Sequence, residues 1–333
     1  MGYHLCNQLK DRYEEIFILD IVPIEPREYP ENAKFFNVDV RRIDQLNEIF
    51  CKVDKIVHAA AALPLWKRKD IFEVNINGTK NVLEAAKNNH NERVVYISST
   101  AVYGIPKTHP IYEDGHLSGV GPYGESKIAA ENICREYQEQ GICVPIVRPK
   151  TFIGTGRLGV FQILYDWIAS GKKIPLVGNG KNRYQLLEVE DLASAIGLML
   201  DGPKDKVNNI FNVGAEEFKT IFEDVDSLCQ FAKTGSRPIL VPASLAKPIL
   251  SFLEKAKMSP LYKWVYDTMD KDSYVSLDRI KDAFGWSAKY SNTEALINSY
   301  RWYLDHKSEL KNTGITHRVA WNQGVLGFLK KFL

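Results

Sequence analysis

The chain has 333 residues, of which 45% are hydrophobic and 25% charged, and its formal net charge is +2. This is ordinary globular composition, which excludes a disordered, collagen-like or coiled-coil protein. The basic residues are scattered among nearly as many acidic ones, so we expect no nucleic-acid partner. The length allows one large domain or two smaller ones.

The five cysteines show neither a C-x-x-C motif nor paired spacing, which indicates free thiols in a reducing compartment. We expect no metal site. The amino-terminal segment soon becomes charged and shows no apolar core of a signal peptide. No run reaches the ~18 apolar residues that a membrane-crossing helix needs. We therefore expect a cytoplasmic protein.

Short apolar segments alternate with longer segments of helical period, which is typical of a parallel sheet covered by helices on both faces. Residues 104–122 are rich in turn formers and are expected to be a surface loop. Amphipathic helices are expected over residues 73–89 and 124–140. The expected strands span residues 16–20, 33–40, 55–60, 93–98, 143–149 and 208–214.

The pattern changes in the second half of the chain to aromatic-rich helical segments with proline-marked breaks. We expect residues 1–155, joined by 185–214, to form the doubly wound sheet domain. Residues 156–184 and 215–312 would form a smaller, mostly helical substrate lobe. Residues 313–333 form an amphipathic tail, which either contacts a membrane surface or packs on the protein's own core, and we favour the second.

The strongest candidate for chemistry combines Ser99 with Tyr123 and Lys127. A tyrosine and a lysine four residues apart share one face of a helix. A nearby ammonium and a cationic nicotinamide both favour the phenolate, which would lower the phenol's pKa. Tyr123 would then exchange a proton with a substrate oxygen, to which the Ser99 hydroxyl would also hydrogen-bond. His58 ends an apolar strand and is interpreted as structural.

The segments VVYISSTAVYG, PYGESKIAAE, IVHAAAALP, EVNINGTKNVLEAA, VRPKTFIGTG and LLEVEDLASAI resemble those of the extended short-chain dehydrogenase/reductases, in the NAD-dependent epimerase/dehydratase branch. The resemblance implies a Rossmann-like fold and an NAD-dependent enzyme. It also implies that Tyr123 is the acid/base, that Lys127 tunes it and holds the nicotinamide ribose, and that Ser99 is the catalytic hydroxyl residue.

The same resemblance implies which residues bind the cofactor. Asp20 matches the acid that accepts hydrogen bonds from the adenosine ribose, which favours NAD over NADP. Gly2 matches the last glycine of the glycine-rich turn. The other implied cofactor contacts are Asp39 and Val40 beside the adenine, and Ala59, Ala60 and Ala61 under the dinucleotide.

Three departures from the family pattern accompany the resemblance. Because the sequence starts at the last glycine, the first strand and two glycines are missing from it, and we interpret this as a start site placed too far downstream or a truncated chain. We expect weaker NAD binding than in a chain extended upstream by about ten residues. Thr151 stands where sugar-nucleotide members usually have asparagine, and Tyr184, next to Arg183, stands where many have a diphosphate-binding arginine.

Thr100 and Ala101 follow Ser99, where dehydratases of this branch have an Asp-Glu pair, so elimination chemistry is disfavoured. Thr100, Thr151, Arg183 and Tyr184 are the expected substrate-binding residues. We expect an NAD-dependent epimerase or dehydrogenase acting on a secondary alcohol of a nucleotide sugar. The alternatives are a dehydrogenase of a hydrophobic or sterol-like alcohol and a non-catalytic dinucleotide-binding scaffold. The resemblance also implies a homodimer formed through two helices per subunit, one of which contains Tyr123.

Overall fold

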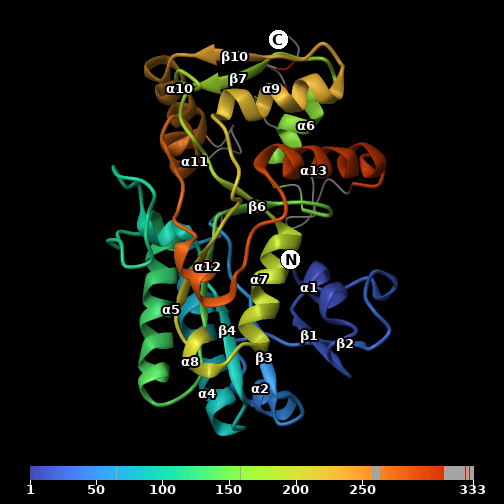
Figure 1. Cartoon of the computed structure of the whole chain (residues 1–333), viewed down its shortest axis with the longest axis vertical. Coiled ribbons are helices and arrows are strands. Elements are labelled where there is room, and N and C mark those ends of the chain that lie inside the picture. The colour runs from blue at the N-terminus through green and yellow to red at the C-terminus, as the bar shows by residue number, and fades with distance from the viewer. Residues whose placement is uncertain (65, 158, 257–262, 311–326, 328–329, 331–333) are drawn as a thin grey trace.

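The computed structural model describes residues 1–64, 66–157, 159–256, 263–310, 327 and 330 (Figure 1). Its centre is a four-stranded parallel sheet in the order β3-β4-β5-β9, and β1 and β2 form a separate parallel pair. All six strands expected from the sequence are present, which confirms the parallel α/β arrangement. Their bounds are β1 (Ile16–Asp20), β2 (Ala33–Asn37), β3 (Lys55–His58), β4 (Arg93–Ile97), β5 (Ile146–Pro149) and β9 (Ile210–Val213).

The sheet is interrupted between β1 and β3. Within the described ranges no strand pairs with both, so β1 is bonded to β2 and β3 to β4. The later crossover is as expected, because β9 returns from the second half of the chain to pair with β5 over four residue pairs, from Ile146–Ile210 to Pro149–Val213.

Every residue of β4 is buried, as are those of β5, which explains why these strands appear as continuous apolar runs rather than as alternating patterns. Helices cover both faces of the sheet (Figure 1). Helix α5 begins at Gly121–Pro122, earlier than expected, because proline is well suited to the first turn of a helix. The helices of this part are α1 (Gly2–Leu9), α2 (Ile43–Phe50), α3 (Arg68–Phe72), α4 (Gly78–Asn88), α5 (Gly121–Glu139), α7 (Val189–Asp201), α8 (Lys204–Val207) and α12 (Asp278–Phe284).

The elements of the second half of the chain that neither belong to the central sheet nor cover it lie together at one end of the molecule (Figure 1). This end is mostly helical, as expected, but it also contains a short parallel pair, β7 with β10, that the sequence pattern did not predict. The pair β6 and β8 links this end to the sheet. The elements are β6 (Thr151–Ile153), α6 (Phe161–Ala169), β7 (Ile174–Val177), β8 (Leu186–Glu188), α9 (Ile221–Ala232), β10 (Pro238–Val241), α10 (Ala243–Lys255), α11 (Lys263–Thr268) and α13 (Asn292–His306).

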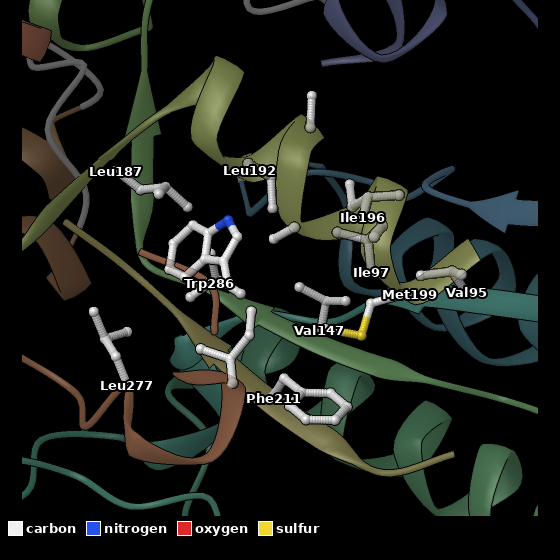
Figure 2. Close-up of a cluster of buried hydrophobic side chains, with 14 of the residues drawn as sticks. Val95, Ile97, Val147, Leu187, Leu192, Ile196, Met199, Phe211, Leu277 and Trp286 are labelled. Carbon is white, nitrogen blue, oxygen red and sulfur yellow. The ribbon is translucent and has the colours of Figure 1, made fainter. Parts of the chain in front are cut away.

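Helix α7 packs against the sheet through apolar side chains. Its apolar side chains lie against those of β4, β5 and β9, with Trp286 among them (Figure 2). The Trp286 indole nitrogen donates to Ser194 on α7 at 2.9 Å, so its buried polar atom is satisfied. This packing fixes the carboxyl ends of the three strands relative to one another.

The expected surface loop over residues 104–122 is largely irregular, and it is joined to the second half of the chain by a bridge between Ile111 and Val275. The carboxyl-terminal tail, residues 313–333, lies outside the described residues except for positions 327 and 330. Lys330 pairs with Asp166 of α6 at 2.6 Å. Within the described parts of the chain, no helix combines the length and apolar character needed to span a bilayer.

Candidate active site

The expected catalytic residues lie where parallel strands end. Ser99 follows β4, and Lys150 follows β5 directly. In open parallel sheets, ligands bind beyond the carboxyl ends of the strands. Tyr123 stands in the first turn of α5, and the short turn Thr100–Tyr103 packs against that helix. The fold therefore brings Ser99 and Tyr123 to the same edge of the sheet.

The hydroxyl of Ser99 lies against the Tyr123 phenol. Ser99 caps the turn Thr100–Tyr103 by accepting a hydrogen bond from the Ala101 amide at 3.1 Å, which fixes its side chain. Burial raises the pKa of Tyr123, while the Arg157 charge and the Ser99 hydrogen bond lower it. The protein alone thus leaves this pKa above its ordinary value, so further positive charge is needed to form the phenolate near neutral pH.

Lys127 stands one helical turn after Tyr123 and is 2% exposed. Its ammonium donates to the Ile97 carbonyl at 2.8 Å and lies 6.0 Å from the centroid of the Tyr123 ring. Burial lowers the pKa of Lys127 to about 8. The side chain is therefore held at the end of β4, on the same helix face as the tyrosine, as the four-residue spacing predicted.

Arg157 is an unexpected member of the site. Its guanidinium stacks on the Phe152 ring at 3.6 Å and donates to the Phe152 carbonyl at 3.0 Å. From there its charge acts on Tyr123. Nothing in the local sequence singles out Arg157, since only the fold brings it to the phenol.

Several residues expected to bind the cofactor are open to a ligand. Asp20 is exposed at the end of β1, and its carboxylate also caps the next turn by accepting from the Val22 amide at 3.0 Å. Ala59 and Ala60 are exposed directly after β3, and the following residue, Ala61, is half-buried. Gly2 begins α1 with open space where a side chain would stand.

Asp39 and Val40 are engaged in local structure. The Asp39 carboxylate accepts from the Arg41 guanidinium at 2.6 Å, and this hydrogen bond lowers the pKa of the acid. Val40 packs closely on Gly78, where an added Cβ would lie 2.7 Å from the valine side chain. The Val40 carbonyl accepts from Asn81 at 3.1 Å. These contacts fix the loop after β2.

The alanine turn after β3 is tied to the catalytic helix through Asn75, a residue that was not expected to matter. Its side chain exchanges hydrogen bonds with the Ala62 backbone and donates to Ser126 at 2.9 Å. His58 is 4% exposed and contacts the Thr79 hydroxyl at 3.0 Å. Burial lowers the pKa of His58 to about 3, which supports its interpretation as a structural histidine.

The expected substrate-binding residues fall into two groups. The hydroxyls of Thr151 and Tyr184 are 2.9 Å apart, and the Thr100 hydroxyl donates to the Pro149 carbonyl at 3.3 Å. Arg183 points elsewhere, because its guanidinium stacks over the Phe218 ring at 4.6 Å. It therefore does not stand beside Tyr184 as a direct replacement. The charge near Tyr184 comes from Lys150, whose ammonium lies 4.9 Å from that ring.

Comparison with known proteins shows what this chain is similar to. The family model described as NAD dependent epimerase/dehydratase family matches residues 1–214. A UDP-glucose 4-epimerase of Lacticaseibacillus casei is 34% identical, with 92% of this chain and 94% of the relative covered. An uncharacterized protein of Sinorhizobium fredii, y4nG, is 33% identical over 98% of this chain and 82% of its own length.

Solved structures share the fold. The epimerase Mth375 of Methanothermobacter thermautotrophicus superposes with a TM-score of 0.76 at 20% identity, covering 92% of this chain and 90% of that one. UDP-glucuronic acid 4-epimerase of Bacillus cereus, solved in complex with NAD, gives a TM-score of 0.75 at 20% identity, covering 91% and 95%.

Proposed function

The chain belongs to the NAD-dependent epimerase/dehydratase family, and from this premise we propose that it acts on a secondary alcohol of a nucleotide sugar, with Tyr123 as the acid/base. It is an enzyme of the extended short-chain dehydrogenase/reductase type, and its cofactor is NAD. The observation that carries the proposal is the meeting of Ser99, Tyr123 and Arg157 at the carboxyl edge of the sheet.

The residues around this edge fit a dinucleotide. Asp20 is an exposed acceptor at the end of β1, suited to the hydroxyls of a ribose. Ala59 and Ala60, directly after β3, are small and exposed, so a ligand can approach the backbone there. Lys127, held by the Ile97 carbonyl, retains further hydrogen-bond donors for the second ribose. We infer that these residues hold NAD across the ends of β1, β3 and β4.

The chemistry divides between cofactor and protein. NAD, held by Asp20 and Lys127, would supply hydride-transfer chemistry at the substrate carbon. Tyr123 takes the proton of the substrate hydroxyl as the hydride leaves, and Ser99 donates a hydrogen bond to the same oxygen. The charge of Arg157 stabilises the phenolate form of Tyr123. A ketone that is retained and reduced again on its other face would give the epimer, and a ketone that is released would make the enzyme a dehydrogenase.

The relatives favour a nucleotide sugar over a sterol-like alcohol. The UDP-glucose 4-epimerase of L. casei is 34% identical over nearly the whole chain. We also propose that the smaller lobe, residues 156–184 and 215–312, holds the sugar nucleotide, and that the enzyme is a homodimer in which α5 lies at the interface. A sedimentation velocity profile of a monomer at micromolar concentration would contradict the dimer.

The test of the chemistry is Tyr123→Phe. Removing the phenol oxygen should lower kcat about 10²- to 10⁴-fold, because general acid–base catalysis contributes on that scale. Activity is measured as interconversion of UDP-glucose and UDP-galactose by product analysis, with NADH absorbance followed to detect net oxidation. NAD affinity and thermal unfolding should stay close to those of the parent protein.

Tyr112→Phe is the matched control, since Tyr112 is 50% exposed on the loop before α5. It should retain full activity. An unchanged kcat in Tyr123→Phe would refute the assignment of the acid/base. Absence of turnover with every nucleotide sugar and every hydrophobic alcohol, in a protein that binds NAD, would favour the scaffold alternative.

A further inference from the structure

Lys150 is a buried lysine whose partners, among the described residues, are neutral. It follows β5 directly and is 3% exposed. Its ammonium donates to the Ser273 hydroxyl at 2.7 Å and lies over the Tyr184 ring. Among the described residues no carboxylate forms an ion pair with it, and burial lowers the pKa of Lys150 to about 7.

Arg148, two positions earlier on β5, is a buried cation that has a carboxylate partner, and it serves as a comparison for Lys150. It is fully buried and pairs with the carboxylate of Glu131 at 2.6 Å. Its remaining donors reach the Tyr103 hydroxyl and the Glu113 carbonyl, both at 2.7 Å. A buried charge normally requires such a partner, because its removal from water is costly. Lys150 has neutral partners instead.

The polar side chains around Lys150 are neutral. The Lys150 ammonium donates to the half-buried Ser273 hydroxyl and lies over the ring of half-buried Tyr184, whose hydroxyl is 2.9 Å from that of Thr151. His109 belongs to the same cluster: its ring lies 4.9 Å from that of Tyr274, next to Ser273, and its Nε2 atom is buried with no hydrogen-bond partner among the described residues. Hydrogen bonds between an ammonium and an oxyanion are stronger than those between neutral groups, so a buried lysine with neutral partners is suited to bind an oxyanion.

The cluster adjoins the reacting end of the site. The backbone amide of Lys150 donates to the Val213 carbonyl of β9 at 2.8 Å, which fixes the position of the residue at the strand end. Thr100, directly after Ser99, donates to the carbonyl of Pro149, the residue before Lys150. The backbone at Lys150 therefore lies beside the segment that carries the catalytic hydroxyl, whereas the Arg183 guanidinium stacks on Phe218.

We propose that Lys150, assisted by His109, binds an oxyanion group of the substrate, either a phosphate or a carboxylate. The proposal rests on the proposed function for the identity of the substrate, but not for the presence of the anion site. From the sequence, Arg183 and Tyr184 were the substrate-binding residues expected at the position of the family's diphosphate-binding arginine. The structure instead supplies the cation from the end of the neighbouring strand.

The experiment is Lys150→Met in the full chain, with Lys181→Met as the matched control. Lys181 is an exposed lysine on the segment that leads to Tyr184. Methionine keeps the length of the side chain and removes a buried charge, so the variant should fold. Calorimetric titrations use UDP, uridine, UDP-glucose and UDP-glucuronate in the presence of NAD. Thermal unfolding verifies that each variant is folded.

Loss of a charge-assisted contact should weaken binding about 10- to 100-fold in Lys150→Met and leave it unchanged in Lys181→Met. Weaker binding of UDP and UDP-glucose, with uridine unaffected, identifies a phosphate. Weaker binding of UDP-glucuronate alone identifies a sugar carboxylate. Equal affinities of parent and variant for all four ligands would overturn the proposal.

Failure of the proposed function gives a different result. If the parent protein binds none of the nucleotide ligands, free pyrophosphate and free glucuronate are titrated into the parent and into Lys150→Met. A lower affinity in the variant for either anion supports the site even though the substrate class is wrong. Equal affinities, or no binding of either anion to the parent, would overturn the anion site itself. His109→Gln should give a smaller loss in the same direction as Lys150→Met.

Discussion

The Tyr123 phenol illustrates how few residues set the chemistry of this site. Burial raises its pKa, and the opposing influence of the protein comes first from Arg157 and then from the Ser99 hydroxyl. Lys127 was expected to supply that influence, but its ammonium donates to the Ile97 carbonyl, 6.0 Å from the centre of the phenol ring. We infer that the lysine positions the cofactor and that the arginine favours the phenolate.

Arg157→Gln tests this division of roles. Removing the guanidinium should raise the pKa of Tyr123, because a positive charge that stabilised the phenolate is gone. The pH at which activity is half-maximal should therefore move upward, while Arg157→Lys, which keeps the charge, should move it less. The measurement is the pH dependence of kcat/KM for the parent and both variants. A lower kcat/KM with an unchanged profile would assign Arg157 a purely structural role.

Single residues also mark the limit of what the sequence could predict. Ser99 and Tyr123 could be expected to meet, because each stands in a recognisable motif next to a strand end or a helix start. Arg157 and His109 lie in loops whose positions depend on the whole fold. Lys150 had a visible signal, because it is a lysine directly after a buried strand.

At the scale of elements, α5 is fixed to the sheet by one buried ion pair. Glu131 on the helix accepts from the Arg148 guanidinium of β5 at 2.6 Å and from the Ser98 hydroxyl of the strand end at 2.6 Å. Both charged residues are fully buried. The same helix carries Tyr123 in its first turn, so this pair sets the position of the phenol relative to the end of β4.

Glu131→Gln should destabilise the fold strongly. It leaves the Arg148 charge buried without a carboxylate, and breaking a buried pair in this way costs about 3–5 kcal/mol. The free energy of unfolding is measured by urea denaturation. Lys69→Gln, at an ion pair whose lysine is 82% exposed, should change it by less than about 0.5 kcal/mol. Equal changes in the free energy of unfolding for the two substitutions would mean that the buried pair contributes no more to stability than the exposed one.

Element types were predictable, but their ends were less so. The expected strand over residues 33–40 ends at Asn37, because Asp39 and Val40 turn away to bind Arg41 and to pack on Gly78. The expected strand over residues 55–60 ends at His58 for a similar reason, since the alanines that follow leave the ladder. The pair β7 and β10 was missed because strands of four residues between helices give little periodic signal.

At the scale of the whole molecule, three buried ionisable groups of the described chain with strongly shifted pKa values lie at the ends of different strands. Lys127 faces the end of β4, Lys150 follows β5 and Glu188 ends β8. Burial lowers the pKa of the two lysines to about 8 and about 7 and raises that of Glu188 to about 8. Such shifts are concentrated at functional sites. The fold therefore loses stability at the edge where ligands are expected to bind.

Glu188→Gln measures how much stability the protein loses by burying this carboxyl group. Glu188 is 2% exposed, and its Oε2 atom has no hydrogen-bond partner within the described part of the chain. The folded-state pKa of about 8 exceeds the unfolded value, so the folded protein retains the proton over the interval in which the unfolded chain releases it. Stability from this group is complete at pH values below the unfolded pKa and is lost as the pH rises through about 8. Glutamine mimics the protonated acid and does not titrate.

The variant should therefore match the parent in free energy of unfolding near pH 4.5 and exceed it by a few kcal/mol at pH 9, since each pKa unit corresponds to ~1.4 kcal/mol. Urea denaturation at these two pH values gives the difference directly. Glu309→Gln, at an exposed carboxyl on the protein surface, should show the same small difference at both. A gain in Glu188→Gln that is independent of pH would show that glutamine improves the packing rather than removing a buried charge.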